Sequence, residues 1–235
     1  MRTSPVSWGK HSRLSASAVP GRGITLAGVG LMVLLLTGCG TLQRGVDMAR
    51  GAVFGPKGVR PAPEEVAASP YAQLLIEDDA VSAVMLLGND DDGRTAWFTD
   101  QHVLFLCEGD LVCGTHGLSA RLDDMRIVGP NPFVDLRAIG QAPSTVDRRY
   151  DWHDGYRYGV QVTGTVRRVG EEEVEILERK RTLVRYEEQL SGGVDGKNIY
   201  WIDPATGQLR KSRQLVAPGH YAEIEILKPY RRRVQ

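Results

Sequence analysis

Short apolar runs separated by turn residues fill the chain from Tyr71 onward, a pattern typical of a meandering antiparallel sheet. The clearest alternation lies in 221–227, where two isoleucines would face one side of a strand and two glutamates the other. The pattern predicts an all-β domain over 71–230: a curved antiparallel meander sheet of about ten strands, half-barrel or sandwich-like, with few short helices. Strands are predicted at 72–77, 81–87, 95–99, 103–107, 111–115, 144–152, 156–169, 173–189, 197–203, 208–216 and 221–227.

Three segments fit this pattern less well. Residues 171–189 contain many helix formers, but apolar residues alternate there with charged neighbours, so a long strand pair is favoured over a helix. Residues 118–128 are mixed in character and leave room for a short helix, while 129–143 contain three prolines and predict an irregular connection. Gly159 and Gly164 indicate bulges or bends of a curved sheet.

The N-terminal region has a different pattern, in which a basic segment precedes the uninterrupted apolar stretch Ile24–Leu36. A helix needs roughly 20 residues to cross a bilayer, and this stretch has 13. A secretory signal peptide over 1–38 is therefore favoured over a transmembrane anchor. The following Leu36-Thr37-Gly38-Cys39 resembles a lipobox, in which the cysteine receives a diacylglycerol and, after cleavage, an N-acyl chain. Gly40, in place of an aspartate, points by the same resemblance to the outer membrane.

The segment between this cysteine and the predicted domain reads as a connector. Residues 39–70 are rich in proline, glycine and alanine, and predict a lipidated N-terminus followed by a flexible tether. Thirty flexible residues reach roughly 30 Å. Residues 231–235 form a basic tail. Apart from the covalent lipid on Cys39, the sequence predicts no cofactor and no metal.

Charge excludes one class of function. Removal of the signal leaves 25 basic and 29 acidic residues, a net charge of −4. This mildly acidic balance gives no support for nucleic-acid binding.

Two cysteines remain in the mature chain besides the lipidation site. Cys107 and Cys113 flank a glycine turn between two apolar runs. In an oxidising compartment such a pair favours a disulfide over two free thiols or a metal site. A three-residue loop at 109–111 would place the cysteines directly opposite each other, whereas a two-residue turn at Gly109-Asp110 would make them diagonal.

The C-terminal third and a segment near Trp97 carry a family resemblance, in the segments Ala96–Asp100, Asn198–Asp203, Thr206-Gly207, Arg210–Gln214 and Glu223–Pro229. Together they resemble the YjbF/GfcB family of outer-membrane lipoproteins, which are encoded with exopolysaccharide and group 4 capsule genes. The resemblance covers about residues 70–230 together with the lipobox. The Trp-Ile-Asp-Pro-x-Thr-Gly step is also similar to a strand–turn–strand of LolA-like lipoprotein carriers.

Catalytic motifs are not found in the sequence: it has no His-Glu-x-x-His, no Gly-x-Ser-x-Gly, no phosphate loop and no clustered metal-ligand spacing. The most suggestive group is Asp151-Trp152-His153-Asp154, but alternate residues of a strand point to opposite faces and would divide it. The run Asp90–Asp92 lacks the later glutamate of an EF-hand. A solvated turn is the favoured interpretation of that run.

Two sets of side chains suit a sugar polymer. Aromatic rings offer stacking faces if they line an open groove, and arginines pair with acidic glycans. The alternative is that the aromatic residues belong to the core and that the arginines belong to a solvated strand face and tail. The main candidates for glycan or partner contact are Trp97, Trp201, Arg210 and Arg213, with Trp152, Tyr156, Tyr158, Lys211 and Arg231–Arg233 as further members of the two sets.

By its resemblance, the chain is expected to be a lipid-anchored outer-membrane accessory in the assembly or export of an extracellular polysaccharide. It would face the periplasm and act without catalysis. Its expected partners are polysaccharide-export proteins, among them an outer-membrane β-barrel, and the polysaccharide. Two alternatives stay open: a LolA-like lipid or lipoprotein carrier, which needs an open apolar face, and a glycan-modifying enzyme, which needs convergent carboxylates in a groove.

Overall fold

The computed structural model describes residues 58–230. The predicted signal peptide, Cys39 and the basic tail at 231–235 lie outside the described residues. Within the described part, no helix has the length and apolar character to cross a membrane.

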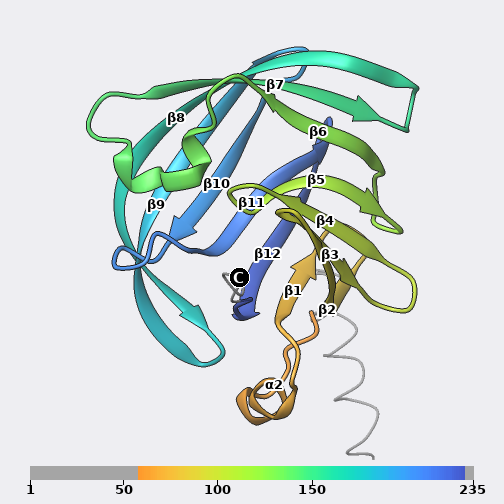
Figure 1. Cartoon of the computed structure of the whole chain (residues 1–235), viewed down its shortest axis with the longest axis vertical. Helices are drawn as coiled ribbons and strands as arrows, with labels where there is room; N and C mark the ends of the chain where they lie inside the picture. Colours follow the sequence, from red (N-terminus) through yellow and green to blue (C-terminus); the bar gives the residue numbers. More distant parts are fainter. Residues whose placement is uncertain (1–57, 231–235) are drawn as a thin grey trace, which may run out of the picture. The chain divides into compact units, whose positions relative to one another are not determined.

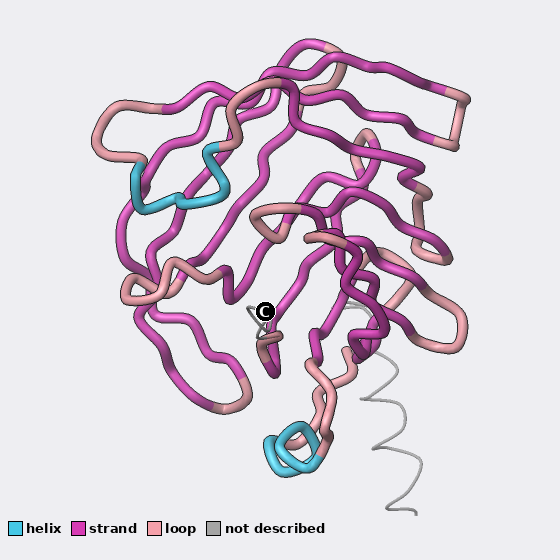
Figure 2. Tube along the Cα trace, viewed as in Figure 1, coloured by secondary structure: helices cyan, strands magenta, loops and turns pink. Residues whose placement is uncertain are grey.

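Twelve antiparallel strands form one sheet (Figures 1 and 2). Strands that follow one another in the sequence pair with each other, except β5 and β6, which lie at the two ends of the sheet. The first strand also pairs with the last. β5 and β6 lie beside each other, so the sheet forms a nearly closed barrel. The strands are β1 (Gln73–Glu77), β2 (Ser82–Asp91), β3 (Arg94–Phe98), β4 (Val103–Cys107), β5 (Leu111–His116), β6 (Leu122–Val128), β7 (Ser144–Trp152), β8 (Arg157–Ile176), β9 (Arg179–Gly192), β10 (Gly196–Ile202), β11 (Leu209–Ala217) and β12 (His220–Lys228).

The predicted all-β meander is confirmed, and the additional strand is β6. Residues 118–128, for which a short helix was open, contain this strand because Leu122 and Met125 pack into the core. A bulge between Leu122 and Asp124 shifts the alternation by one residue, which hides the strand pattern in the sequence.

The segment over 171–189 is a strand pair, as predicted, and not a helix. Its first strand, β8, is longer than expected and runs without a break from Arg157 to Ile176. A bulge lies at Gly159, which has a φ of +66°. Gly164, in contrast, is regularly paired, and its missing side chain leaves room for Glu188 inside the barrel. Regular pairing on both sides excludes a bulge at Gly164.

The barrel interior is filled by one apolar cluster to which nearly every strand contributes. A 3₁₀ helix, η1 (Pro132–Ala138), lies within the connection that was predicted as irregular and inserts Phe133 and Leu136 into this cluster. The side chain of Asn131 caps η1 by accepting a hydrogen bond from the backbone N–H of Phe133 at 2.9 Å.

Part of the predicted tether is folded. Helix α2 (Pro63–Ala68) buries Val66 against Leu75 and Leu227 on the outer side of the sheet. Arg60 pairs with Glu77 at 2.9 Å. The ordered domain therefore begins before residue 71, because these short apolar and charged contacts extend it toward the N-terminus.

A second apolar cluster lies on the outer side of the barrel. It joins Val174 and Ile176 of β8 and Leu183 of β9 to Trp201 of β10. Leu177, in the β8–β9 turn, packs against both this cluster and the one that contains Val66. The tip of the long hairpin is thereby held against the outer surface of the sheet.

Candidate functional site

Cys107 and Cys113 form a disulfide, with their Sγ atoms 2.04 Å apart and their Cα atoms 5.8 Å apart. Neither of the two predicted registers is correct. The loop comprises residues 108–110, so Cys107 pairs with Leu111, and a bulge at Phe105/Leu106 adjusts the position of Cys113. The bridge thus joins diagonal positions across an irregular hairpin.

The tryptophans proposed as stacking faces are buried. Trp97 lies in the barrel core, and its Nε1–H donates to Thr95 Oγ1 at 3.0 Å. Trp201 belongs to the outer apolar cluster, and its Nε1–H donates to Glu172 Oε2 at 3.0 Å. Trp152 is fully enclosed. Their rings contribute to packing and are not displayed in an open groove.

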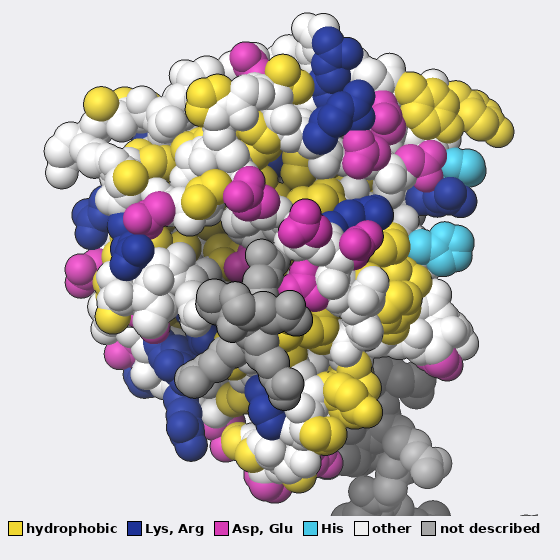
Figure 3. All heavy atoms as spheres, in the orientation of Figure 1, with side chains coloured by type: hydrophobic (Ala, Val, Ile, Leu, Met, Phe, Trp, Pro, Cys, Tyr) yellow, Lys and Arg dark blue, Asp and Glu magenta, His cyan; other side chains and the backbone are white. Residues whose placement is uncertain are grey.

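Two tyrosines at the β7–β8 turn are strongly exposed instead, Tyr156 by 77% and Tyr158 by 54%. Figure 3 shows hydrophobic side chains projecting from this end of the sheet, next to acidic and histidine side chains. His153 lies with its ring centroid 6.0 Å from that of Tyr156 and with its Nδ1 3.3 Å from Asp123. This turn therefore combines exposed rings with hydrogen-bonding groups.

The group Asp151-Trp152-His153-Asp154 does not converge on one point. Trp152 points into the core, as the alternation of a strand requires. Asp151 accepts a hydrogen bond from the backbone N–H of Gly159 and pairs with Arg126 at 3.3 Å. Asp154 accepts from the backbone N–H of Arg121. Each carboxylate has a separate structural partner.

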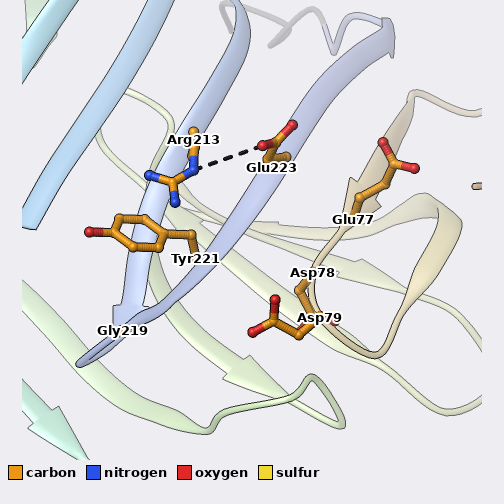
Figure 4. Close-up of a pocket in the computed structure, with 7 residues that line it drawn as sticks. All are labelled: Glu77, Asp78, Asp79, Arg213, Gly219, Tyr221 and Glu223. Carbon is orange, nitrogen blue, oxygen red and sulfur yellow. Dashed lines mark ion pairs between the residues drawn. The ribbon is translucent and has the colours of Figure 1, made fainter. Parts of the chain in front are cut away.

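Arg213 borders a cavity of about 260 Å³ on the outer side of the sheet (Figure 4). Its guanidinium lies over the ring of Tyr221 at 3.5 Å and pairs with Glu223 at 3.8 Å. The opposite wall of the cavity is the end of β1 and the following turn, Glu77–Asp79.

The acidic groups of this cavity are held by other parts of the fold. Asp78 accepts three backbone N–H bonds, from Ala80, Val81 and Ser119. Asp79 lies 3.1 Å from His220 Nδ1. With Glu77 bound to Arg60 and Glu223 to Arg213, each carboxylate of this acidic wall has a partner of its own.

Arg210 is placed differently from what its sequence context indicates. It is 8% exposed, although the strand face was expected to be solvated. Burial, together with the nearby charge of Arg181, lowers its pKa from the usual value. Lys211, its neighbour, pairs with Glu225 at 3.7 Å on the outer side of the sheet.

A polar cluster inside the barrel was missed from the sequence. Arg148 donates to Glu188 through Nε at 2.8 Å and Nη2 at 3.0 Å, with side chains only 1% and 0% exposed. Glu188 also accepts from Asn198 Nδ2 and Tyr200 O–H, both at 2.8 Å. The sequence offers one signal for this cluster: Arg148 occupies a position of the alternating segment 144–152 that otherwise holds apolar residues.

Burial governs the electrostatics of this cluster. It raises the pKa of Tyr150 to about 12, because the phenolate would be poorly solvated there. Burial by itself lowers the pKa of Arg148, but the charge of Glu188 outweighs it and the pKa of Arg148 is raised. The cluster therefore places an ion pair inside the barrel, away from solvent.

A further cavity, of about 440 Å³, lies at the seam where the β4–β5 hairpin meets β6. Glu108 and Leu111 form one side, and Met125 and Ile127 the other. Asn131 Nδ2 donates to the backbone carbonyl of Glu108 at 3.4 Å and bridges the two sides.

Comparisons with known proteins agree with this architecture. The chain is 24% identical over 206 residues to the uncharacterized lipoprotein GfcB of Escherichia coli K12. This alignment covers 85% of this chain and 96% of the relative. The crystal structure of the hypothetical lipoprotein YmcC from Escherichia coli K12 has the same fold, with a TM-score of 0.65 at 24% identity, covering 79% of this chain and 96% of that one.

The family comparison spans most of the chain. Residues 46–227 match the sequence model described as group 4 capsule polysaccharide lipoprotein GfcB, YjbF. This range includes the whole twelve-stranded sheet except the last residue of β12. The chain therefore belongs to the YjbF family of group 4 capsule polysaccharide lipoproteins.

Proposed function

We propose that this protein is a lipid-anchored outer-membrane accessory in the assembly or export of an extracellular polysaccharide, and that it acts by binding and not by catalysis. The observation that carries the proposal is the family match over residues 46–227. Anchoring would occur through Cys39, with the domain on the periplasmic side. Its partners would be polysaccharide-export proteins, including an outer-membrane β-barrel, and the polysaccharide itself.

The non-catalytic role is supported by how the acidic side chains are used. Retaining and inverting glycosidases need two carboxyl groups that flank one bond. In the described domain, Glu188 is sealed inside the barrel by Arg148. The carboxylates around the outer cavity bind arginine, histidine or backbone N–H groups. The glycan-modifying alternative has less support for this reason.

The carrier alternative is weakened by the packing of the barrel. A lipid carrier needs an apolar cavity large enough for an acyl chain. Here the interior is occupied by the side chains of one continuous cluster, including Trp152 and Tyr186, and by the buried ion pair. The cavity beside Arg213 and Glu223 has a strongly polar wall.

The proposal predicts that loss of the gene lowers the amount of secreted and cell-bound polysaccharide, and that the intact gene restores it. A Cys39→Ala variant is expected not to restore it, because an unacylated chain loses the membrane attachment that several acyl chains provide. The measurement is polysaccharide yield in the four strains, with the protein located by membrane fractionation.

Unchanged polysaccharide in the deletion strain would contradict the proposed function. Full rescue by Cys39→Ala, with the variant found in the soluble fraction, would contradict the role of the anchor alone. An abundance measurement by immunoblot separates these results from loss of the variant by degradation.

Exposed tyrosines at the β7–β8 turn are the described aromatic residues best placed for sugar contact. Replacing Tyr156 and Tyr158 by alanine is expected to weaken binding of the purified cell polysaccharide roughly tenfold, which corresponds to about 1.4 kcal/mol. The thermal midpoint of unfolding should stay unchanged, since both rings are largely in solvent. Binding is measured by calorimetry.

Tyr71 is a matched control, because it is 57% exposed and lies away from that turn in the sequence. Tyr71→Ala should bind like the wild type. Equal weakening by both variants, or no weakening by the double variant, would remove the β7–β8 turn from the polysaccharide-binding surface.

A further inference from the structure

The end of the β8–β9 hairpin extends past its neighbours in the sheet (Figure 1). β7 pairs with β8 only as far as Val166, and β10 pairs with β9 only from Val184 onward. Residues 172–183 therefore form a two-stranded ribbon with no third strand beside it in the described part of the chain. An isolated two-stranded hairpin is marginally stable in water, so the position of this ribbon depends on contacts outside the ladder.

A bulge lies just before the ribbon. The register between β8 and β9 shifts between Arg168 and Gly170, which makes Val169 the extra residue. Val169 is 49% exposed, so its side chain does not fix this point of the strand to the core. Because a bulge disrupts the ladder and bends the strand locally, the base of the ribbon is a point at which it can swing relative to the barrel.

The turn at the tip of the ribbon has an unusual sequence for its conformation. Ile176 pairs with Arg179, so Leu177 and Glu178 make a two-residue turn, and their φ angles are +49° and +60°. Two positive φ angles are typical of a type I′ turn, for which Asn-Gly is a preferred sequence. A leucine is disfavoured in this left-handed region, and the turn by itself gives no reason for its presence.

Packing explains the leucine. Leu177 is half-buried and packs against two apolar clusters on the outer side of the sheet. The first cluster contains Trp201 and belongs to the hairpin and β10. The second contains Val66, Leu75 and Leu227, and joins α2 to β1 and β12. The tip of the ribbon therefore reaches the cluster that holds α2.

Polar contacts serve the base of the ribbon and its two strands. Glu172, at the base, accepts a hydrogen bond from Trp201 Nε1–H at 3.0 Å and pairs with Arg185 at 3.3 Å. Farther out, Glu173 pairs with Lys180 at 2.7 Å, and both residues belong to the ribbon. Attachment of the tip to the rest of the domain thus comes from apolar packing.

α2 depends on the same packing. It has six residues, and a helix this short is not stable by itself in water. Its buried residue, Val66, is 4% exposed within the second of the two clusters. Lys228 Nζ also donates to the backbone carbonyls of Ala67 and Ser69 at the end of the helix. Two elements that are marginal in isolation therefore share one apolar cluster.

We infer that α2 and the tip of the ribbon form a latch, in which each holds the other against the outer side of the sheet and the release of either loosens both. Undocking of α2 removes Val66 from the surface on which Leu177 packs, and a swing of the ribbon removes Leu177 from the same cluster. An open latch exposes apolar side chains of both clusters, Trp201 among them. The latch stands on these contacts and does not depend on the proposed function.

The place of α2 in the chain gives the latch a direction. α2 is the helix nearest to Cys39 in the described part of the chain. A displacement on the N-terminal side of the domain that pulls α2 from the sheet would therefore free the ribbon, which lies more than a hundred residues farther along the chain.

The test measures amide hydrogen exchange by mass spectrometry on the purified full chain in detergent. Leu177→Asn removes the docking side chain and supplies a residue that the turn prefers. Exchange in residues 172–183 and in α2 should become at least about tenfold faster, because the loss of an apolar contact favours the open state of both segments. β10 should exchange as in the wild type, which shows that the barrel remains folded.

Glu178→Gly is the matched control. Glu178 is exposed and is the other left-handed residue of the turn, so glycine relieves the backbone there without touching either cluster. Exchange in the ribbon should stay the same or become slower. A change in the same direction in Glu178→Gly and Leu177→Asn would overturn the inference, because the turn conformation and not docking would then control the ribbon.

A second variant approaches the latch from the other side. Val66→Ala shortens the buried side chain of α2 and should speed exchange in residues 172–183 as well as in α2, since a coupling between two segments is reciprocal. Glu64→Gln, an exposed change on the same helix, should leave the ribbon as in the wild type. Faster exchange confined to the substituted segment, or no change in either Leu177→Asn or Val66→Ala, would overturn the latch, because the two segments would then open independently.

Discussion

Replacing Glu188 by alanine is expected to lower the free energy of unfolding by about 3–5 kcal/mol, which is typical when one partner of a buried ion pair is removed. The variant leaves the guanidinium of Arg148 without a counter-charge in the barrel interior. It also leaves the side chains of Asn198 and Tyr200 without the acceptor they share. Chemical denaturation followed by tryptophan fluorescence measures the loss.

Glu175→Ala is the matched control, since Glu175 is an exposed glutamate on β8 and its loss should change stability by no more than about 0.5 kcal/mol. The double variant Arg148→Met/Glu188→Gln should lose less than Glu188→Ala. It removes both charges while the amide oxygen still accepts from Asn198 and Tyr200. If Glu188→Ala were as stable as the control, the buried pair would have no structural role.

Trp201→Ala is expected to destabilise the domain by about 3–5 kcal/mol, the range found when a buried aromatic residue is cut back to alanine. Trp201 packs against Val174, Ile176 and Leu183, and its Nε1–H donates to Glu172. Without the indole, the tip of the β8–β9 hairpin loses its attachment to the outer side of the sheet. Limited proteolysis should then cut near Leu177 faster than in the wild type.

Trp201→Phe is informative because it keeps much of the apolar contact and removes only the hydrogen bond. Its loss of stability should therefore be smaller than that of Trp201→Ala. A Trp201→Ala variant that kept wild-type stability but bound polysaccharide poorly would contradict the structural role. It would return Trp201 to the set of glycan-contacting residues.

The local pattern was enough to predict β4 and β7 with correct ends, because β4 is a short continuous apolar run between turns and β7 alternates between buried and more exposed positions. It failed for β6, where the bulge between Leu122 and Asp124 breaks the period. Gly164 shows the same limit in another way. A glycine in a strand suggests a bend, but here it provides space for a carboxylate from the next strand.

Some of the candidate residues were predicted correctly from the local sequence, whereas the surroundings of others depend on the tertiary structure. The pairing of Cys107 with Cys113 was expected from six residues of separation and a glycine turn, and the structure contains that bridge. The tryptophans and tyrosines were equivalent as a list of aromatic residues. Trp97 and Trp201 lie in packed clusters, whereas Tyr156 lies at a turn in solvent. Composition does not distinguish these surroundings, because they depend on which strands cover a residue.

Short-range features of the chain thus specify its strands and its hairpin disulfide, since each depends on residues near one another in the sequence. The order of its short motifs specifies its family. The Arg148–Glu188 pair, 40 residues apart, arises only when β7, β8 and β9 lie side by side. Strand register and the closing of the sheet decide which charges are buried and which find a partner. Burial and pairing of charges are long-range consequences of packing, and a local sequence pattern does not predict them.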